Sequence, residues 1–258
     1  MPIHSTAIVH PTARIASTAD IGPYCIIGEE VEIGAGSRLM ANVYAEGPTW
    51  IGEENIFYPY TTVGVASQDL KYKGERAETR IGSRNRIREF VTIHRGTEGG
   101  GLVTRIGDDN LLMAYVHVAH DVQVGNNTVL SHGATLGGHV LVEDWAIVGA
   151  YTGVHQFCRI GRHAFIGGYS VVTQDVLPYS TSVSEREIHV FGANRTGLER
   201  RGFTGERIET LQKAFRLLSR AGLNTSQAVE RIRAEIDATP ELDELLAFIA
   251  ASERGFVK

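Results

Sequence analysis

Aliphatic side chains recur at every sixth position along most of the chain. Counting in sixes from Ile3 meets an apolar residue at every step as far as Val63. After an interruption the pattern returns at Ile81, and a final uninterrupted run extends from Ile106 to Val172. The position four residues after each of these aliphatics is small or β-branched in nearly all cases. Regularity of this length does not arise by chance.

A six-residue period fits neither the 3.6-residue turn of an α-helix nor the two-residue alternation of a long strand. It suits a coil of three short flat faces joined by tight turns, in which the aliphatic side chain points inward and the small residue fills a corner. Stacked coils pair at the usual strand spacing of about 4.8 Å, so roughly ten coils make a column on the order of 45 Å long. We therefore predict that residues 1–193 form a mainly β domain, a parallel β-helix of stacked coils.

Two excursions interrupt the column. The stretch "GVASQDLKYKGERAETR" puts Asp69 and Glu75 where aliphatic residues are required, which predicts a loop near residues 64–80. The stretch "HRGTEGGGLVTR" breaks the six-residue phase, and its three consecutive glycines favour a second loop near residues 94–105. Long loops on a rigid scaffold usually carry function.

The hydrophobic period becomes helical after about residue 194. Residues 205–221 carry one apolar stripe at helical spacing, with Thr204 as the expected cap and Gly222 as the expected stop. Two further helices are expected, one after "NTSQ" and one beginning near Pro240. Residues 194–258 are thus predicted to form a C-terminal helical domain that caps the column.

Composition narrows the range of functions. The chain has 258 residues and a formal net charge of −5, which argues against a general nucleic-acid binder. The sequence shows neither an apolar run of membrane-spanning length nor a secretory signal, so we expect a cytoplasmic protein without stable membrane insertion. The two cysteines, Cys25 and Cys158, are too few for a disulfide scaffold and too isolated for a zinc site, and are expected to be small buried thiols.

Histidines gather in one part of the repeat, where six of the ten lie between residues 117 and 163. Four of them avoid the inward position of the period: His117, His120, His139 and His155. Positions 18 residues apart stack in neighbouring coils, which places His139 in register with Asp121 and puts Gly138 beside His120. This arrangement favours a functional cluster on the outer wall over histidines of the core.

A neutral imidazole beside a carboxylate is a standard general base, and His120 precedes Asp121 directly. The backbone N–H of Gly138 could face a developing oxyanion. No nucleophile stands out nearby, which favours direct transfer between two bound substrates over a covalent intermediate. The rival interpretation is a catalytic zinc site made by His117, His120 and a third histidine, although a spacing of three in an extended coil puts the first two on different edges.

Six motifs follow one another in order over nearly the whole chain, including both excursions and the helical tail. They are "QDLKYKGE" (68–75), "IREFVTIHRGT" (87–97), "HVAHD" (117–121), "GGHVLVEDWA" (137–146), "GVHQFCRIG" (153–161) and "ERRGF" (199–203). Together they resemble the UDP-N-acetylglucosamine O-acyltransferases, a family of hexapeptide-repeat enzymes. The resemblance implies a left-handed parallel β-helix, a homotrimer with active sites between adjacent columns, and no cofactor or metal.

The resemblance further implies transfer of a 3-hydroxyacyl group from acyl carrier protein to the 3-hydroxyl of UDP-N-acetylglucosamine, the first step of lipid A biosynthesis. By motif match, His120 is the general base, Asp121 orients it and the Gly138 amide binds the oxyanion. Residues matched to the glucosamine are Asp69, Lys71, His117 and His139. Residues matched to the uridine diphosphate are His155, Gln156, Asn194, Arg200 and Arg201. Gly168 matches the position whose bulk limits acyl length.

Two departures from the family pattern keep further hypotheses open. The segment "SEREIHVFGAN" (184–194) differs from the usual approach to the helical domain, and Thr196 replaces a glutamate that follows Asn194 by two places in the family. A 3-amino sugar nucleotide therefore remains an alternative acceptor. Two hypotheses of another class are a hexapeptide carbonic anhydrase and a non-catalytic binding trimer. The intact His120–Asp121 pair counts against the binding trimer.

Overall fold

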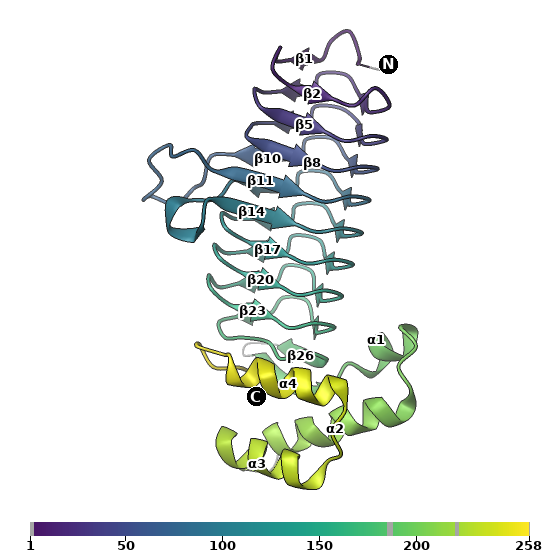
Figure 1. Cartoon of the computed structure of the whole chain (residues 1–258), viewed down its shortest axis with the longest axis vertical. Coiled ribbons are helices and arrows are strands. Elements are labelled where there is room, and N and C mark those ends of the chain that lie inside the picture. The colour runs from purple at the N-terminus through teal and green to yellow at the C-terminus, as the bar shows by residue number, and fades with distance from the viewer. Residues whose placement is uncertain (1–2, 185–187, 220–221, 258) are drawn as a thin grey trace.

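The chain is a triangular column of short parallel strands with a group of helices at its C-terminal end (Figure 1). The structure is a computed structural model that describes residues 3–184, 188–219 and 222–257. Up to residue 172, strands of the column pair in parallel with the third strand after them, so that Ile8 lies beside Ile26 and Thr135 beside Gly153. The predicted stacking of residues 18 apart is therefore the actual register over most of the column.

Three sheets form the sides of the column, here called faces 1, 2 and 3 in the order in which the chain visits them. Face 1 contains β1 (Ile8–Val9), β4 (Ile26–Ile27), β7 (Tyr44–Ala45), β10 (Thr62–Val65), β13 (Thr92–His94), β16 (His117–Val118), β19 (Thr135–Leu136), β22 (Gly153–Val154) and β25 (Val171–Val172). Face 2 contains β2 (Arg14–Ile15), β5 (Val31–Ile33), β8 (Thr49–Ile51), β11 (Glu78–Ile81), β14 (Val103–Ile106), β17 (Gln123–Val124), β20 (Leu141–Val142) and β23 (Arg159–Ile160). Face 3 contains β3 (Asp20–Ile21), β6 (Arg38–Leu39), β9 (Ile56–Phe57), β12 (Arg86–Ile87), β15 (Leu111–Leu112), β18 (Val129–Leu130), β21 (Ile147–Val148), β24 (Phe165–Ile166), β26 (Ser180–Ser184) and the antiparallel β27 (Ile188–Ala193).

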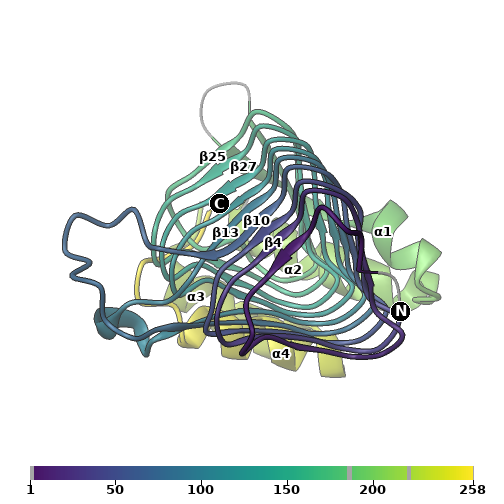
Figure 2. The same ribbon diagram turned by 90° about the horizontal axis from the view of Figure 1, so that it is seen from above.

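The coil is left-handed. Seen from its N-terminal end, the chain turns counter-clockwise as it recedes, passing from face 1 to face 2 and then to face 3 (Figure 2). This confirms the handedness that the family resemblance implied, against the right-handed rule for most crossovers. The tight corners hold residues in the left-handed backbone region, among them Asp121 (φ 61°) and His139 (φ 62°). Such conformations are unfavourable for residues other than glycine, and the paired strands on both sides maintain them.

The interior of the column is filled as the six-residue period predicts. From Ile21 onward the inward positions are buried aliphatics and one phenylalanine, such as Phe57, Leu112 and Leu136, whereas Ile3, Val9 and Ile15 at the open end are partly exposed. Cys25 and Cys158 are buried free thiols, which confirms their expected role. Polar residues at one edge satisfy one another in a ladder, in which the Asn85 side-chain amide donates to Asn55 Oδ1 at 2.9 Å. Buried polar groups are tolerated here because each has a partner.

Both excursions leave the column at the same edge, between faces 1 and 2, and lie next to each other (Figure 2). The first comprises residues 66–77 and the second residues 95–102, so each is shorter than predicted because its ends belong to strands. The second contains a 3₁₀ turn, Glu98–Gly100. The Glu98 N–H donates to Glu75 Oε1 at 3.2 Å, which joins the two loops. Together they cover the edge where the histidine cluster lies.

In the described part of the chain after the column, the helices are α1 (Arg195–Arg200), α2 (Gly205–Ser219), α3 (Thr225–Glu235) and α4 (Pro240–Ala250). The last three agree with the predicted helices. Asn224 begins α3 with a capping box, and Thr239 caps α4, whose first residue is proline. The short α1 was not predicted. Within the described ranges, none of the helices is long and apolar enough to cross a membrane.

An aromatic stack joins the column to the helices at the edge between faces 2 and 3. The ring of His163 lies between Trp145 and Tyr179, at centroid distances of 5.9 and 5.6 Å, and Phe203 meets it edge-on. The Arg201 guanidinium lies 4.8 Å from the centroid of Trp145. His163 is 6% exposed and its Nδ1 has no hydrogen-bond partner, so burial, assisted by Arg201, lowers the pKa of its imidazole to about 4.

We expect this buried histidine to make the protein sensitive to acid. Unfolding returns the His163 pKa toward 6.5, so as the pH falls from there to about 4 the unfolded chain binds a proton that the folded chain does not. Each unit of pKa difference is worth about 1.4 kcal/mol, which makes the loss of stability about 3 kcal/mol at most. His163→Phe keeps a ring in the stack and should lose less stability to acid than the parent, as measured by denaturant unfolding at about pH 7 and about pH 4.5.

The matched control is His132→Phe, at a half-buried histidine of another edge that contacts Tyr115 and Tyr151. This variant should lose as much stability between about pH 7 and about pH 4.5 as the parent protein does. An equal loss in the parent and in His163→Phe would contradict the assignment.

Candidate active site

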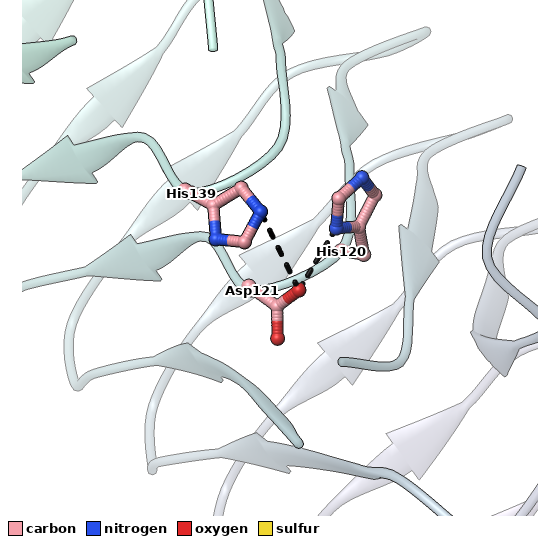
Figure 3. A group of neighbouring side chains, drawn as sticks. All are labelled: His120, Asp121 and His139. Carbon is pink, nitrogen blue, oxygen red and sulfur yellow. Dashed lines mark hydrogen bonds and ion pairs between the residues drawn. The ribbon is translucent and has the colours of Figure 1, made fainter. Parts of the chain in front are cut away.

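Three titratable side chains meet at the edge between faces 1 and 2 (Figure 3). His120 Nδ1 lies 2.8 Å from Asp121 Oδ2, and His139 Nε2 lies 4.0 Å from the same oxygen. The rings of His120 and His139 are perpendicular, with centroids 5.1 Å apart. His120 and Asp121 follow β16, and His139 follows β19, so the same turn of two consecutive coils supplies all three.

The Asp121 carboxylate is covered by the second excursion. Its side chain is 1% exposed, and it accepts hydrogen bonds from the Thr97 backbone N–H at 2.9 Å and from the Thr97 hydroxyl at 2.6 Å. The Asp121 backbone N–H donates to Thr104 Oγ1 at 2.8 Å. With His120 as a further donor, the carboxylate has the partners that a buried anion requires. Within this chain, the second excursion therefore shields the Asp121 carboxylate from water.

His120 presents its second ring nitrogen away from Asp121. Because a carboxylate accepts hydrogen bonds, Nδ1 carries the proton and Nε2 is the basic nitrogen. Nε2 lies 3.9 Å from Asp69 Oδ2, which belongs to the first excursion and is too distant for a hydrogen bond. A group placed between Nε2 and Asp69 would therefore face a base on one side and a carboxylate on the other.

Gly138 lies against the His120 ring, and a Cβ at this position would come within 2.5 Å of His120 Cε1. Glycine is therefore required here by close approach. Gly138 is buried, and its backbone N–H has no acceptor among the described residues. A free, buried N–H beside a histidine base is the arrangement that stabilises an oxyanion.

Two further histidines border the cluster on face 1. His117 Nδ1 lies 2.7 Å from Thr92 Oγ1, and the ring of His94 packs edge-on against His117 at 4.9 Å. Burial lowers the pKa of His117, and it lowers that of His94 to about 4. Burial also lowers the pKa of His139, although Asp121 opposes this. The imidazoles around His120 are thus held neutral near pH 7.

Other predicted site residues extend along the same edge. Lys71 is exposed on the first excursion, and its backbone N–H donates to Asp69 Oδ1 at 3.0 Å. His155 and Gln156 are exposed one coil beyond His139. Phe157, also on that coil, stacks on His139 with a centroid distance of 4.4 Å and an interplanar angle of 7°.

The remaining predicted site residues lie at other edges of the same chain. Gly168 lies between faces 3 and 1. Asn194 is buried at the edge between faces 2 and 3, where its side chain caps α1 and donates to the His163 carbonyl. Arg201 is held over Trp145 at that edge, whereas Arg200 is exposed with no partner among the described residues. A single chain therefore does not bring all of the predicted residues together.

Of the divergent segment 184–194, residues 185–187 lie outside the described residues, and the neighbouring residues belong to β26 and β27. Thr196 is exposed on α1.

The cluster also bears on metal binding. His120, Asp121 and His139 each offer one ligand atom, and these atoms lie within 4.8 Å of one another. Two imidazoles and a carboxylate could hold a divalent ion such as Zn²⁺. The set differs from the one considered from sequence, since His117 is not part of it. In the structure the Asp121 oxygens are already engaged by Thr97 and His120, which favours an acid–base pair.

Sequence reasoning missed two residues of the site, His94 and Thr97. Both fall in the motif "IREFVTIHRGT", so the signal was present in the chain. The second excursion interrupts the six-residue phase directly after them, and stacking by 18 residues cannot place a residue across such an interruption.

Comparisons with known proteins find relatives over the whole chain. Residues 175–257 match the family described as "Udp N-acetylglucosamine O-acyltransferase; Domain 2", and residues 104–138 match the bacterial transferase hexapeptide repeat. A relative from Thermodesulfovibrio yellowstonii is 48% identical and one from Herminiimonas arsenicoxydans is 44% identical, each over 99% of both chains. Both are described as acyl-[acyl-carrier-protein]–UDP-N-acetylglucosamine O-acyltransferases.

Solved structures of similar proteins share the whole fold. The UDP-N-acetylglucosamine acyltransferase of Francisella novicida is 39% identical, with a TM-score of 0.95 over 98% of this chain and 93% of that one. The corresponding enzyme of Bacteroides fragilis is 39% identical, with a TM-score of 0.96 over 99% of this chain and 100% of that one.

Proposed function

This chain belongs to the UDP-N-acetylglucosamine O-acyltransferase family, and on that premise we propose that it transfers a 3-hydroxyacyl chain from acyl carrier protein to the 3-hydroxyl of UDP-N-acetylglucosamine. The reaction is the first step of lipid A biosynthesis, carried out in the cytoplasm. The observation that carries the proposal is the buried His120–Asp121 pair beside the free N–H of Gly138. These groups are a base, its orienting carboxylate and an oxyanion donor, which acyl transfer requires.

His120 acts as the general base. The sugar hydroxyl lies between His120 Nε2 and Asp69, and Nε2 removes its proton as the oxygen attacks the thioester carbonyl. The Gly138 N–H stabilises the oxyanion of the tetrahedral intermediate. Collapse of the intermediate breaks the carbon–sulfur bond, and the His120 imidazolium returns the proton to the departing thiolate. Asp121 holds the proton on Nδ1 throughout and stabilises the imidazolium.

No enzyme nucleophile takes part in this scheme. Cys158 is fully buried, and burial raises the pKa of its thiol to about 11, so it is neither accessible nor ionised. Direct transfer from one bound substrate to the other therefore remains the mechanism that these residues support.

The acyl chain lies along face 1. His117, next to the catalytic edge, is followed along the column by Thr135, Gly153 and Val171 on the same face. A Cβ on Gly153 would meet nothing within 4 Å, so the chain's own packing does not require glycine there. Glycine inside a strand often marks the close approach of a ligand. Gly168 lies at the far edge of this face and limits the length of the chain.

A homotrimer completes the site. The base lies at the edge between faces 1 and 2, whereas Asn194, Arg200 and Arg201 lie at the edge between faces 2 and 3. A second chain packed against the first brings its nucleotide-binding edge to the catalytic edge of its neighbour. The exposed guanidinium of Arg200 suits a diphosphate, while Arg201 is occupied by Trp145.

We expect purified protein to acylate UDP-N-acetylglucosamine with 3-hydroxyacyl-acyl carrier protein, and His120→Ala to lower kcat by about 10²- to 10⁴-fold, the usual contribution of a general base. Mass spectrometry of the products measures the reaction, and circular dichroism verifies the fold. The matched control is His132→Ala, because His132 follows its inward aliphatic by two places as His120 does, but at another edge. Near-normal turnover by His120→Ala would refute the base assignment.

The same assay distinguishes this function from its rivals. A 3-amino analogue of the acceptor, offered beside UDP-N-acetylglucosamine, tests the choice between hydroxyl and amine. Elemental analysis of active protein tests the carbonic anhydrase hypothesis. Zinc bound at one ion per site, together with loss of activity on chelation, would favour the cluster of His120, Asp121 and His139 as a metal centre.

Arg200→Ala should raise the KM for the sugar nucleotide by about tenfold with a smaller effect on kcat, because it removes a charge-assisted contact to the diphosphate. Arg195→Ala is the control, since Arg195 lies on the same helix but pairs with Glu199 and Glu209. Steady-state kinetics with varied nucleotide measures both. Equal KM values for the two variants would exclude a diphosphate role for Arg200.

Gly168→Met should shift acyl preference to shorter chains, because the new side chain fills the end of the proposed path. Competition between acyl carrier protein thioesters of different lengths measures the preference, and retained activity with the short donor is the internal control. An unchanged preference would place the end of the path elsewhere.

A further inference from the structure

The second excursion shields Asp121 from water and also donates hydrogen bonds to its carboxylate. Two groups of Thr97 donate to the carboxylate: the backbone N–H to Oδ1 at 2.9 Å and to Oδ2 at 3.1 Å, and the hydroxyl to Oδ2 at 2.6 Å. His120 Nδ1 donates to the same Oδ2 at 2.8 Å. The hydroxyl of Thr97 and the imidazole of His120 thus share one carboxylate oxygen.

The backbone at two glycines of the loop, Gly96 and Gly100, lies close to the same carboxylate. A Cβ on Gly100 would lie 2.0 Å from Asp121 Cγ, whereas one on Gly96 would first meet Val103 N at 2.2 Å and then Asp121 Oδ1 at 2.8 Å. By contrast, a Cβ on Gly99 would meet nothing within 4 Å. The loop backbone therefore touches the carboxylate at Gly96 and Gly100 because side chains are absent there.

We propose that Thr97 is a positioning residue that sets the orientation and the acceptor strength of Asp121, and through Asp121 the basicity of His120. This inference rests on the proposed function, in which His120 is the general base. Among the described residues no hydrogen bond joins Thr97 to His120, so the hydrogen bonds link the two only through the carboxylate.

The direction of the effect follows from the shared oxygen. A hydrogen bond donated to a carboxylate disperses its negative charge and weakens it as an acceptor for other donors. Removing the Thr97 hydroxyl leaves more charge on Oδ2, which strengthens the bond to His120 Nδ1 and stabilises the imidazolium. The carboxylate is then held on its loop side by the Thr97 backbone N–H alone, so it is less fixed and aims the Nε2 of His120 less precisely.

Thr97→Val removes the hydroxyl and keeps the shape and the backbone donor. We expect kcat to fall by about ten- to a hundredfold, the range for one hydrogen bond to a charged group, with KM unchanged. The acid limb of the kcat/KM profile should move to higher pH, because it reports protonation of the free base. Thr97→Ser restores the donor and should restore both kcat and the limb.

Thr128→Val is the matched control for a lost buried hydroxyl. Thr128 is 1% exposed and donates to Asn110 Oδ1 at 2.8 Å on another edge of the column. It should lower thermal stability without moving the pH profile. A Thr97→Val enzyme with the parent kcat and acid limb would overturn the proposal, as would a fall in kcat that Thr97→Ser does not rescue.

The glycine pair gives an independent test of the same contact. Gly100→Ala forces a methyl group against Asp121, so it should lower kcat at least tenfold while KM stays near that of the parent. Gly99→Ala changes the same turn of the loop without touching the carboxylate, and should behave as the parent. Equal activity of the two variants would contradict the contact.

NMR of the His120 Nδ1–H proton separates failure of this inference from failure of the proposed function. The His120→Ala spectrum assigns the resonance, and Thr97→Val should move it downfield, as expected for a stronger hydrogen bond to Asp121, whether or not His120 is the catalytic base. If His120→Ala remains active while this resonance moves, only the proposed function fails. If the resonance does not move, the positioning role of Thr97 is wrong.

Discussion

Each coil of the column has room inside for one aliphatic side chain per face, and this limit governs the rest of the molecule. The inward positions are filled by residues such as Ile87 and Leu130, which are fully buried. A charged or catalytic group cannot enter this interior without losing its hydration. All chemistry is thereby confined to the outward positions and the corners, where Asp121 and His139 lie. The regular core explains why the functional residues are found at an edge.

An outward position alone would leave a histidine in bulk water. The two excursions change this at one edge, because they leave the column next to each other (Figure 2) and reach the turn that follows β16, where Thr97 contacts Asp121 and Asp69 lies near His120. The pair His120 and Asp121 becomes nearly inaccessible although neither points into the core. Interruptions of the repeat thus create the buried polar environment that the repeat itself cannot supply.

The six-residue period predicted the features of the structure that follow from regular stacking of the coils. It gave the three-faced coil, the buried thiol of Cys158 and the approach of His139 to Asp121, because stacking by 18 residues is a property of the regular coil. It could not place Thr97 on Asp121, since the second excursion breaks the phase between them. The joint at His163 was missed for another reason: it depends on how the helices pack against the column, and the repeat carries no information on that. The handedness came from the resemblance, because a left-handed and a right-handed coil share one hydrophobic pattern.

The division of residues among edges separates two tasks. The acid–base pair is complete within one chain, since Thr97, Asp121 and His120 are held by hydrogen bonds that need no second molecule. In the proposed function Arg200 binds the nucleotide; it lies at another edge and would meet that pair through a second chain. The edges of a prism point away from one another, so one chain cannot bring residues of two edges to one substrate. In the proposed function, the acid–base pair is therefore ordered within one chain, and a second chain supplies the residues that recognise the nucleotide. An isolated chain would then keep an ordered base with little affinity for the nucleotide, so assembly would act on substrate binding more than on the proton transfer.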